Sequence, residues 1–171
     1  MKKIFHYLSV ASLILFAACG NNSSIKDNSS VSEKTIIQKT EMVPLDLFSA
    51  KINATINAPK GATATADDFD ATVSGGDGFS MTIETFEASA PTIAEIKKDV
   101  EKNEVNQFVK YIADEAEGIV YQSKAFNDEF HFNYIVSIGD KTYHIYDRRG
   151  KTFTQENVQQ MFDAAKTMKA K

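Results

Sequence analysis

The sequence predicts an α+β fold, in which a mostly antiparallel sheet carries a mid-chain helix and a long C-terminal helix packed on it. Apolar and polar residues alternate with period two in several short segments, which is typical of half-buried strands. A capping-box pattern at 92–95 and an apolar stripe of helical spacing at 158–168 indicate the two helices. The resulting order of strands, helix, strands and helix is typical of an α+β domain.

The first half of the domain consists of predicted short strands separated by turns. Residues 52–58 alternate between apolar and polar side chains. Pro59-Lys60-Gly61 ends this strand, because proline lacks an N–H donor and glycine tolerates a positive φ. A weaker strand is expected at 62–66. Residues 69–86 predict a β-hairpin with a flexible turn at Gly75-Gly76-Asp77-Gly78.

The middle of the chain begins with a helix whose N-cap is Thr92, and Glu95 completes the capping box three residues later. The apolar stripe of this helix is formed by Ile93, Ile96 and Val100. Residues 105–112 fit a helical stripe, although part of the segment also fits a strand, and we expect a helix there. A short strand is expected at 119–122, directly after Gly118.

The clearest strand signal is a hairpin at 129–148, where large apolar side chains share one face. Gly139-Asp140 is a two-residue turn of the kind that favours hairpins. This turn predicts one register, in which the opposed pairs are Ile138 with Lys141, Val136 with Tyr143, and Tyr134 with Ile145. A slip of one residue would expose these apolar side chains, so the pattern favours this register over its neighbours.

The last predicted helix begins at Thr154, with Glu156 in the first turn, where the helix dipole favours an acid. Its apolar stripe, which must dock on the sheet, consists of Val158, Met161, Phe162, Ala165 and Met168. A long C-terminal helix after a strong hairpin resembles the Mog1/PsbP-like αβα sandwich, over residues 45–170. The resemblance implies a sandwich fold and carries no functional residues to this chain.

The N-terminal segment has the build of a secretory signal peptide. Two lysines precede a mostly apolar segment at 4–16, and Ala17-Ala18 stand directly before Cys19. These three residues resemble the lipobox of bacterial lipoproteins, whose cysteine is acylated and becomes the first residue of the mature chain. Phe16 departs from the leucine that is usual at its position. Residues 1–18 are therefore expected to be a lipoprotein signal peptide, with lipidation at Cys19.

The expected anchor has consequences for location and domain organisation. Gly20 and Asn21 lack the aspartate that retains lipoproteins in the inner membrane. The resemblance thus implies a lipid-anchored envelope protein in the outer membrane of a Gram-negative bacterium. Residues 19–40 are polar and have no apolar period, which predicts a flexible tether. The single α+β domain at 41–171 then has about 130 residues, enough for one core.

Composition argues against several classes of partner and chemistry. The chain has a net charge of −4, and removing residues 1–18, which hold two lysines and no acid, leaves −6. Such an acidic chain is a poor candidate for binding nucleic acid. Cys19 is the single cysteine, so the chain can form neither an internal disulfide nor a multi-thiolate metal site. The sequence has no P-loop, dinucleotide fingerprint or Gly-x-Ser-x-Gly motif, and we expect no cofactor and no enzymatic activity.

The candidate binding face is the polar face of the 129–148 hairpin, formed by His131, Asn133, His144, Tyr146 and Arg148. In the predicted register His131 opposes Arg148 and His144 opposes Ile135. The two imidazoles are then roughly 13 Å apart at about 3.3 Å per residue. This separation is too large for a shared metal ion, whose ligands lie at about 2 Å. The same pattern is more typical of a sheet face that is covered by solvent or by a helix.

Two acidic clusters are weaker candidates. The group Asp67, Asp68, Asp70 and Asp77 lacks the glycine and glutamate that an EF-hand loop requires, and the run Asp114, Glu115 and Glu117 is typical of a solvated loop. We therefore expect an envelope lipoprotein with a non-catalytic binding or accessory domain, whose partner is an envelope protein or a small ligand. The alternative is a small-ligand-binding or enzyme-inhibitor lipoprotein that uses the polar hairpin face.

Overall fold

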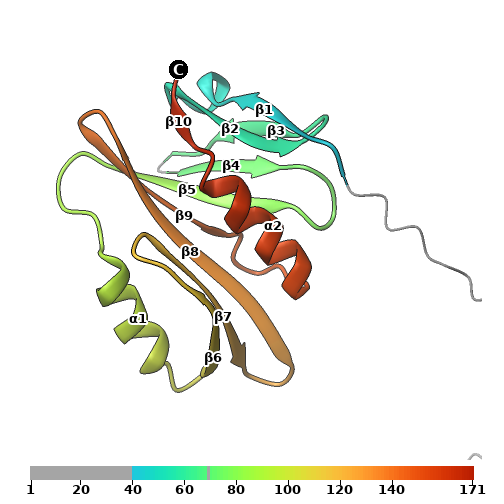
Figure 1. The fold of residues 1–171 in the computed structure, drawn as a ribbon, viewed down its shortest axis with the longest axis vertical. Helices are drawn as coiled ribbons and strands as arrows, with labels where there is room; N and C mark the ends of the chain where they lie inside the picture. The colour runs from blue at the N-terminus through green and yellow to red at the C-terminus, as the bar shows by residue number, and fades with distance from the viewer. Residues whose placement is uncertain (1–39, 69) are drawn as a thin grey trace, which may run out of the picture. The chain divides into compact units, whose positions relative to one another are not determined.

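The structure, a computed structural model, describes residues 40–68 and 70–171. The predicted signal peptide, Cys19, nearly all of the predicted tether and Phe69 lie outside these residues. The described part is mostly antiparallel sheet with two α-helices, which confirms this part of the predicted fold class (Figure 1).

Seven strands form the larger sheet, in the order β3-β4-β5-β9-β8-β7-β6, and each neighbouring pair is antiparallel. These strands are β3 (Thr63–Ala66), β4 (Asp70–Ser74), β5 (Ser80–Phe86), β6 (Gln107–Asp114), β7 (Gly118–Lys124), β8 (Asp128–Ile138) and β9 (Lys141–Asp147). The predicted hairpins at 69–86 and 129–148 are the pairs β4-β5 and β8-β9.

The β8-β9 hairpin has the predicted register. Its opposed pairs include Ile138 with Lys141, Val136 with Tyr143, Tyr134 with Ile145, and Ile135 with His144. Gly139 in the turn has a φ of 65°, a conformation that costs glycine little and other residues more. The pairing extends only as far as Asn133 with Tyr146, so the predicted opposition of His131 and Arg148 is not part of the ladder.

A smaller sheet joins the two ends of the described chain. It has the order β1-β2-β10 and consists of β1 (Met42–Asp46), β2 (Ala54–Pro59) and β10 (Lys169–Ala170). A short 3₁₀ helix, η1 (Phe48–Ala50), connects β1 to β2. The predicted strand at 52–58 thus corresponds to β2, which ends at Pro59 as expected.

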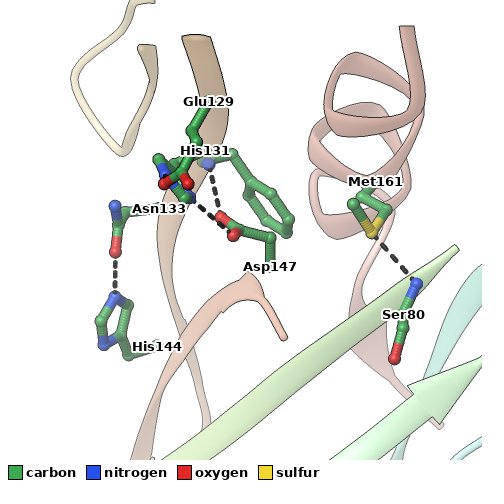
Figure 2. Close-up of polar contacts among 8 residues, drawn as sticks. Ser80, Glu129, His131, Asn133, His144, Asp147 and Met161 are labelled. Atoms are coloured by element: carbon green, nitrogen blue, oxygen red, sulfur yellow. Dashed lines mark hydrogen bonds and ion pairs between the residues drawn. The ribbon is translucent and has the colours of Figure 1, made fainter. Parts of the chain in front are cut away.

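Helix α2 (Gln155–Ala165) packs against β8, β9, β7 and β2, and its packing forms much of the core. Thr154 caps it, as predicted, by accepting a hydrogen bond from the Asn157 N–H. The whole predicted apolar stripe is buried. The ring of Phe162 meets the Tyr134 ring edge-on at a centroid distance of 5.9 Å. The sulfur of Met161 accepts the Ser80 N–H of β5 at 3.2 Å (Figure 2).

The predicted long C-terminal helix is wrong in its length, because α2 is short. The N–H of Asn57 in β2 donates to the Thr167 hydroxyl, which in turn donates to the carbonyl of Ala164. Thr167 therefore joins the end of the helix to the small sheet, and the chain continues as β10. Met168 belongs to the predicted stripe and is buried, although it lies beyond the helix.

Helix α1 (Ile93–Glu101) contacts β6 and β8. Its predicted capping box is present, with Thr92 accepting the Glu95 N–H and the Glu95 carboxylate accepting the Thr92 N–H. No helix in the described part of the chain has the length and apolarity needed to cross a membrane. The residues that follow α1, at 102–106, form a short loop that leads into β6.

The predicted helix at 105–112 is wrong, because most of this segment is the strand β6. The pairing of β6 with β7 shifts register twice, between Phe108 and Lys110 and between Tyr111 and Ala113. Each irregularity changes which side chains face the core, so the apolar residues do not follow a simple period of two. Val109 is 47% exposed, which agrees with a distorted edge strand and not with the buried face of a helix.

A candidate binding cavity over strands β7, β8 and β9

A cavity of about 350 Å³ opens on the sheet face that carries the predicted hairpin residues. Its floor is formed by β7, β8 and β9, and the end of α1 and the loop after it contribute to its rim. Four predicted residues line it, namely His131, Asn133, His144 and Tyr146. The other polar lining residues are Asn103, Asn106, Tyr121, Ser123, Asp147 and Arg149.

Asp147 holds this part of the site together. Where the pairing between β8 and β9 ends, its carboxylate lies between the two strands and is only 6% exposed. Oδ1 accepts the backbone N–H of Phe132 at 2.9 Å, and Oδ2 accepts a hydrogen bond from His131 Nδ1 at 2.8 Å (Figure 2). The side chain of Asp147 thus satisfies a buried backbone donor that lacks an acceptor on the facing strand.

His131 is held between two carboxylates and an aromatic ring. Its Nδ1 bonds Asp147, while Nε2 lies 3.6 Å from a Glu129 carboxylate oxygen, which is too long for a strong hydrogen bond. The Tyr121 ring lies beside it at a centroid distance of 5.3 Å. Burial lowers the pKa of His131, but the bond and charge of Asp147, helped by Glu129, outweigh burial and leave the pKa above its ordinary value.

His144 has the opposite electrostatic balance. Its Nε2 donates to Asn133 Oδ1 at 2.8 Å, and Nδ1 lies 3.4 Å from the Glu84 carboxylate. Burial lowers the pKa of His144 by more than Glu84 raises it, so this imidazole is neutral at pH 7. Tyr146 donates to Glu84 at 2.7 Å, and burial together with this bond raises the pKa of the phenol. Glu84 therefore fixes two cavity residues from the neighbouring strand β5.

Ser123 is the unusual group in the cavity. Ser123 is only 1% exposed, and its hydroxyl has no hydrogen-bond partner among the described residues. A buried hydroxyl without a partner costs about 1–3 kcal/mol, so such groups are rare unless something outside the protein bonds to them. Because Ser123 lines the cavity, a molecule bound there is well placed to supply the missing partner.

The two arginines after β9 have different surroundings. Arg148, which the sequence placed on the binding face, does not line the cavity, and its Nη1 donates instead to Thr72 Oγ1 of β4 at 2.9 Å. Its backbone N–H donates to the Ser80 carbonyl, so the chain follows β5 at this point. Arg149 lines the cavity, with its guanidinium carbon 5.3 Å from the centroid of the Tyr146 ring. This residue is exposed and belongs to the mouth of the cavity.

Sequence reasoning missed several cavity residues for identifiable reasons. Tyr121 and Ser123 alternate on β7, but only the pairing of β7 with β8 shows that they lie beside His131 and Glu129. Asp147 has the strand position of a core residue and could have been singled out, because a carboxylate there requires a partner. Asn103 and Asn106 belong to a loop whose position over the sheet has no local sequence signal.

The two acidic clusters do not contribute to the cavity. Asp114 forms an ion pair with Lys97 at 2.6 Å, and Glu115 forms one with Lys166 at 2.7 Å. Burial and the nearby Glu84 and Asp67 raise the pKa of Asp70. Within residues 40–68 and 70–171, no group of three or more His, Cys, Asp or Glu side chains is arranged to hold a metal ion.

Comparison with known proteins gives little further information. No family model matches the chain, and no curated protein matches it. A crystal structure from Bacteroides thetaiotaomicron VPI-5482 is similar, with a TM-score of 0.36 and 15% sequence identity. The match covers 70% of this chain and 45% of the other, so the chain spans less than half of that protein's length.

Proposed function

We propose that this chain is a lipid-anchored protein of the cell envelope whose domain binds a small ligand in the cavity over β7, β8 and β9. The cavity carries the binding part of the proposal: its volume of about 350 Å³ lies within the usual range for small-molecule sites. Polar side chains from three strands converge on it, and the partnerless Ser123 hydroxyl lines it. The anchor is supported by the signal-peptide pattern at 2–16 and by Ala17, Ala18 and Cys19 that follow it.

The contacts in the cavity favour binding over nucleophilic catalysis. Asp147 orients His131, as a carboxylate orients the base in many hydrolases. A catalytic arrangement of that kind also needs a hydroxyl within hydrogen-bond reach of the base. Ser123 has no hydrogen-bond partner among the described residues, so no bond joins its hydroxyl to His131. The imidazole is thus placed to contact a ligand, and no hydroxyl or thiol within residues 40–68 and 70–171 is hydrogen-bonded to it.

The anchor is tested by comparing the wild type with Cys19→Ala. Membrane fractionation should place the wild type in the outer membrane, and mass spectrometry of its mature N-terminus should find an acylated Cys19. The variant should lose both the acyl groups and the membrane fraction, since the thiol is the lipid acceptor. A soluble wild-type protein with an unmodified cysteine would overturn the anchor and leave the binding proposal standing.

The binding proposal is tested with the full chain, exposed to a small-molecule extract of the producing cells and examined by native mass spectrometry. The wild type should carry a reproducible ligand mass. Asn106→Trp places a large ring at the half-buried rim of the cavity and should abolish that mass. Arg148→Gln changes a residue outside the cavity lining and should retain it. Equal ligand retention by both variants would place the ligand elsewhere.

A further inference from the structure

The side-chain oxygens of Asp147, Asn133 and Asn103 in the cavity already accept hydrogen bonds within the protein. Both oxygens of Asp147 accept bonds, from Phe132 and from His131. Asn133 Oδ1 accepts from His144, and Asn103 Oδ1 accepts the N–H groups of Val105 and Asn106 at 3.0 and 2.9 Å. A ligand that needed to donate hydrogen bonds would have to compete with these internal donors.

Several groups that remain toward the cavity can donate hydrogen bonds. Because Asn133 and Asn103 use their oxygens internally, their amide nitrogens are what they can offer, and Figure 2 shows the Asn133 nitrogen turned away from His144. The Ser123 hydroxyl has a hydrogen to donate and no partner among the described residues. The Arg149 guanidinium at the mouth carries a permanent positive charge.

We propose that the cavity binds a small molecule through a single carboxylate group, which accepts hydrogen bonds from the amides of Asn133 and Asn103, from Ser123 and from Arg149. This inference rests on the proposed function, and it adds the chemical class of the ligand. These donors suit a ligand group that accepts several hydrogen bonds, and the Arg149 guanidinium favours one that carries negative charge.

The charge around the cavity limits how much negative charge a ligand can carry. Arg149 is the permanent cation of the lining, and protonated His131 adds a second positive charge. Three carboxylates contact the histidines of the cavity: Asp147 on β9 and Glu129 on β8 lie beside His131, and Glu84 on β5 lies beside His144. A phosphate ligand with two negative charges would be repelled by these three side chains about twice as strongly as a carboxylate ligand with one. The carboxylate ligand therefore fits the cavity better. The rings of Tyr121 and Tyr146 can contact the uncharged body of the ligand.

The experiment uses the full chain in detergent and titrates it calorimetrically with benzoate and acetate, with methyl benzoate as a neutral control and phenyl phosphate as a dianionic control. At least one carboxylate should bind, and methyl benzoate and phenyl phosphate should bind more weakly. Arg149→Gln should weaken carboxylate binding at least about 10-fold, the usual effect of losing a charged hydrogen bond. Arg148→Gln removes the same charge one residue earlier and should change binding less than about 2-fold.

Binding should also weaken between about pH 6 and about pH 8.5, as His131 loses its proton between Asp147, Glu129 and Tyr121. His131→Gln should remove this pH dependence. The inference would be overturned if methyl benzoate bound as tightly as the carboxylates, or if Arg149→Gln and Arg148→Gln weakened binding equally. It would also be overturned if neither benzoate nor acetate bound. If the wild type carries an uncharged ligand from the cell extract and Asn106→Trp does not, the proposed function stands, but the inference that the ligand is a carboxylate is overturned. Absence of both extract and carboxylate binding would overturn both.

Discussion

Asp147 is the residue whose removal should most clearly separate its structural role from its electrostatic role. Asp147→Ala leaves the buried N–H of Phe132 without an acceptor, which costs about 1–3 kcal/mol. It also removes the charge-assisted bond to His131, for which about 1.5–3 kcal/mol is typical. Asp147→Ala also removes the free-energy cost of burying a charged carboxylate, which offsets part of the two losses. We therefore expect about 3 kcal/mol of destabilisation in total.

Asp147→Asn provides the matched comparison. The amide keeps an oxygen that can accept the Phe132 N–H, but its NH₂ group replaces the oxygen that accepts from His131, so the charge and the hydrogen bond to His131 are lost together. We expect about 1–2 kcal/mol of destabilisation for this variant, together with a fall in the pKa of His131, since Asp147 is the main group that raises it.

The measurement is urea denaturation followed by far-ultraviolet circular dichroism, because the chain has no tryptophan. His131 is titrated in parallel by NMR. A double-mutant cycle with His131→Gln should show coupling below the ordinary imidazole pKa of about 6.5 and less coupling once pH rises above the raised pKa of His131. The reasoning is refuted if Asp147→Ala costs less than about 1 kcal/mol, or if neither Asp147 variant lowers the pKa of His131.

Four further outcomes follow from the same contacts. Gly118→Ala should destabilise the protein by about 1–3 kcal/mol in thermal unfolding, because the new Cβ would stand 2.6 Å from the Phe162 ring and 2.9 Å from the Asn133 carbonyl oxygen; an unchanged melting temperature would contradict this packing. Ser123→Ala should leave the unfolding free energy of the unliganded protein unchanged or raise it by up to about 1 kcal/mol, since no hydrogen bond is lost; a clear loss of stability would reveal a hidden partner. Thr154→Ala should cost about 1 kcal/mol through loss of the N-cap of α2, measured by urea denaturation. Protonation of His131, whose folded pKa is raised, should stabilise the protein fully below the ordinary value of about 6.5, and this stabilisation should disappear as pH rises through the raised pKa; if denaturation curves of the wild type and His131→Gln differ by a constant amount across that window, the assigned shift is incorrect.

Local sequence chemistry was sufficient wherever a single turn or cap decides the structure. Gly139-Asp140 fixed the register of β8 against β9, and Thr92 and Thr154 marked both helix starts. The helix prediction at 105–112 was wrong because the two register shifts of β6 disturb the alternation of apolar and polar residues that identifies a strand. The predicted length of α2 was wrong because Thr167 accepts a hydrogen bond from Asn57, and a contact between residues so far apart in the chain has no local sequence signal.

The candidate site was predictable only where it lies on one regular hairpin. His131, Asn133, His144 and Tyr146 followed from alternation along β8 and β9. That alternation placed Arg148 with them, but its long side chain reaches Thr72 on β4 and leaves the mouth to Arg149. The remaining lining residues come from β7 and from the loop after α1, and local periodicity does not specify which elements lie beside or above a hairpin.

The end of the β8-β9 ladder links the stability of the fold to the cavity. At Asn133 and Tyr146 the two strands stop pairing, and the chain after β9 continues to follow β5. This separation leaves Phe132 without a ladder acceptor, and Asp147 supplies one while also orienting His131 toward the cavity. A regular ladder there would satisfy Phe132 with a backbone carbonyl and make a buried carboxylate unnecessary. The protein keeps the costlier arrangement, a buried charge, in a cavity that is also lined by a hydroxyl without a partner among the described residues. That coincidence is most simply explained if the irregular strand end is retained for ligand binding.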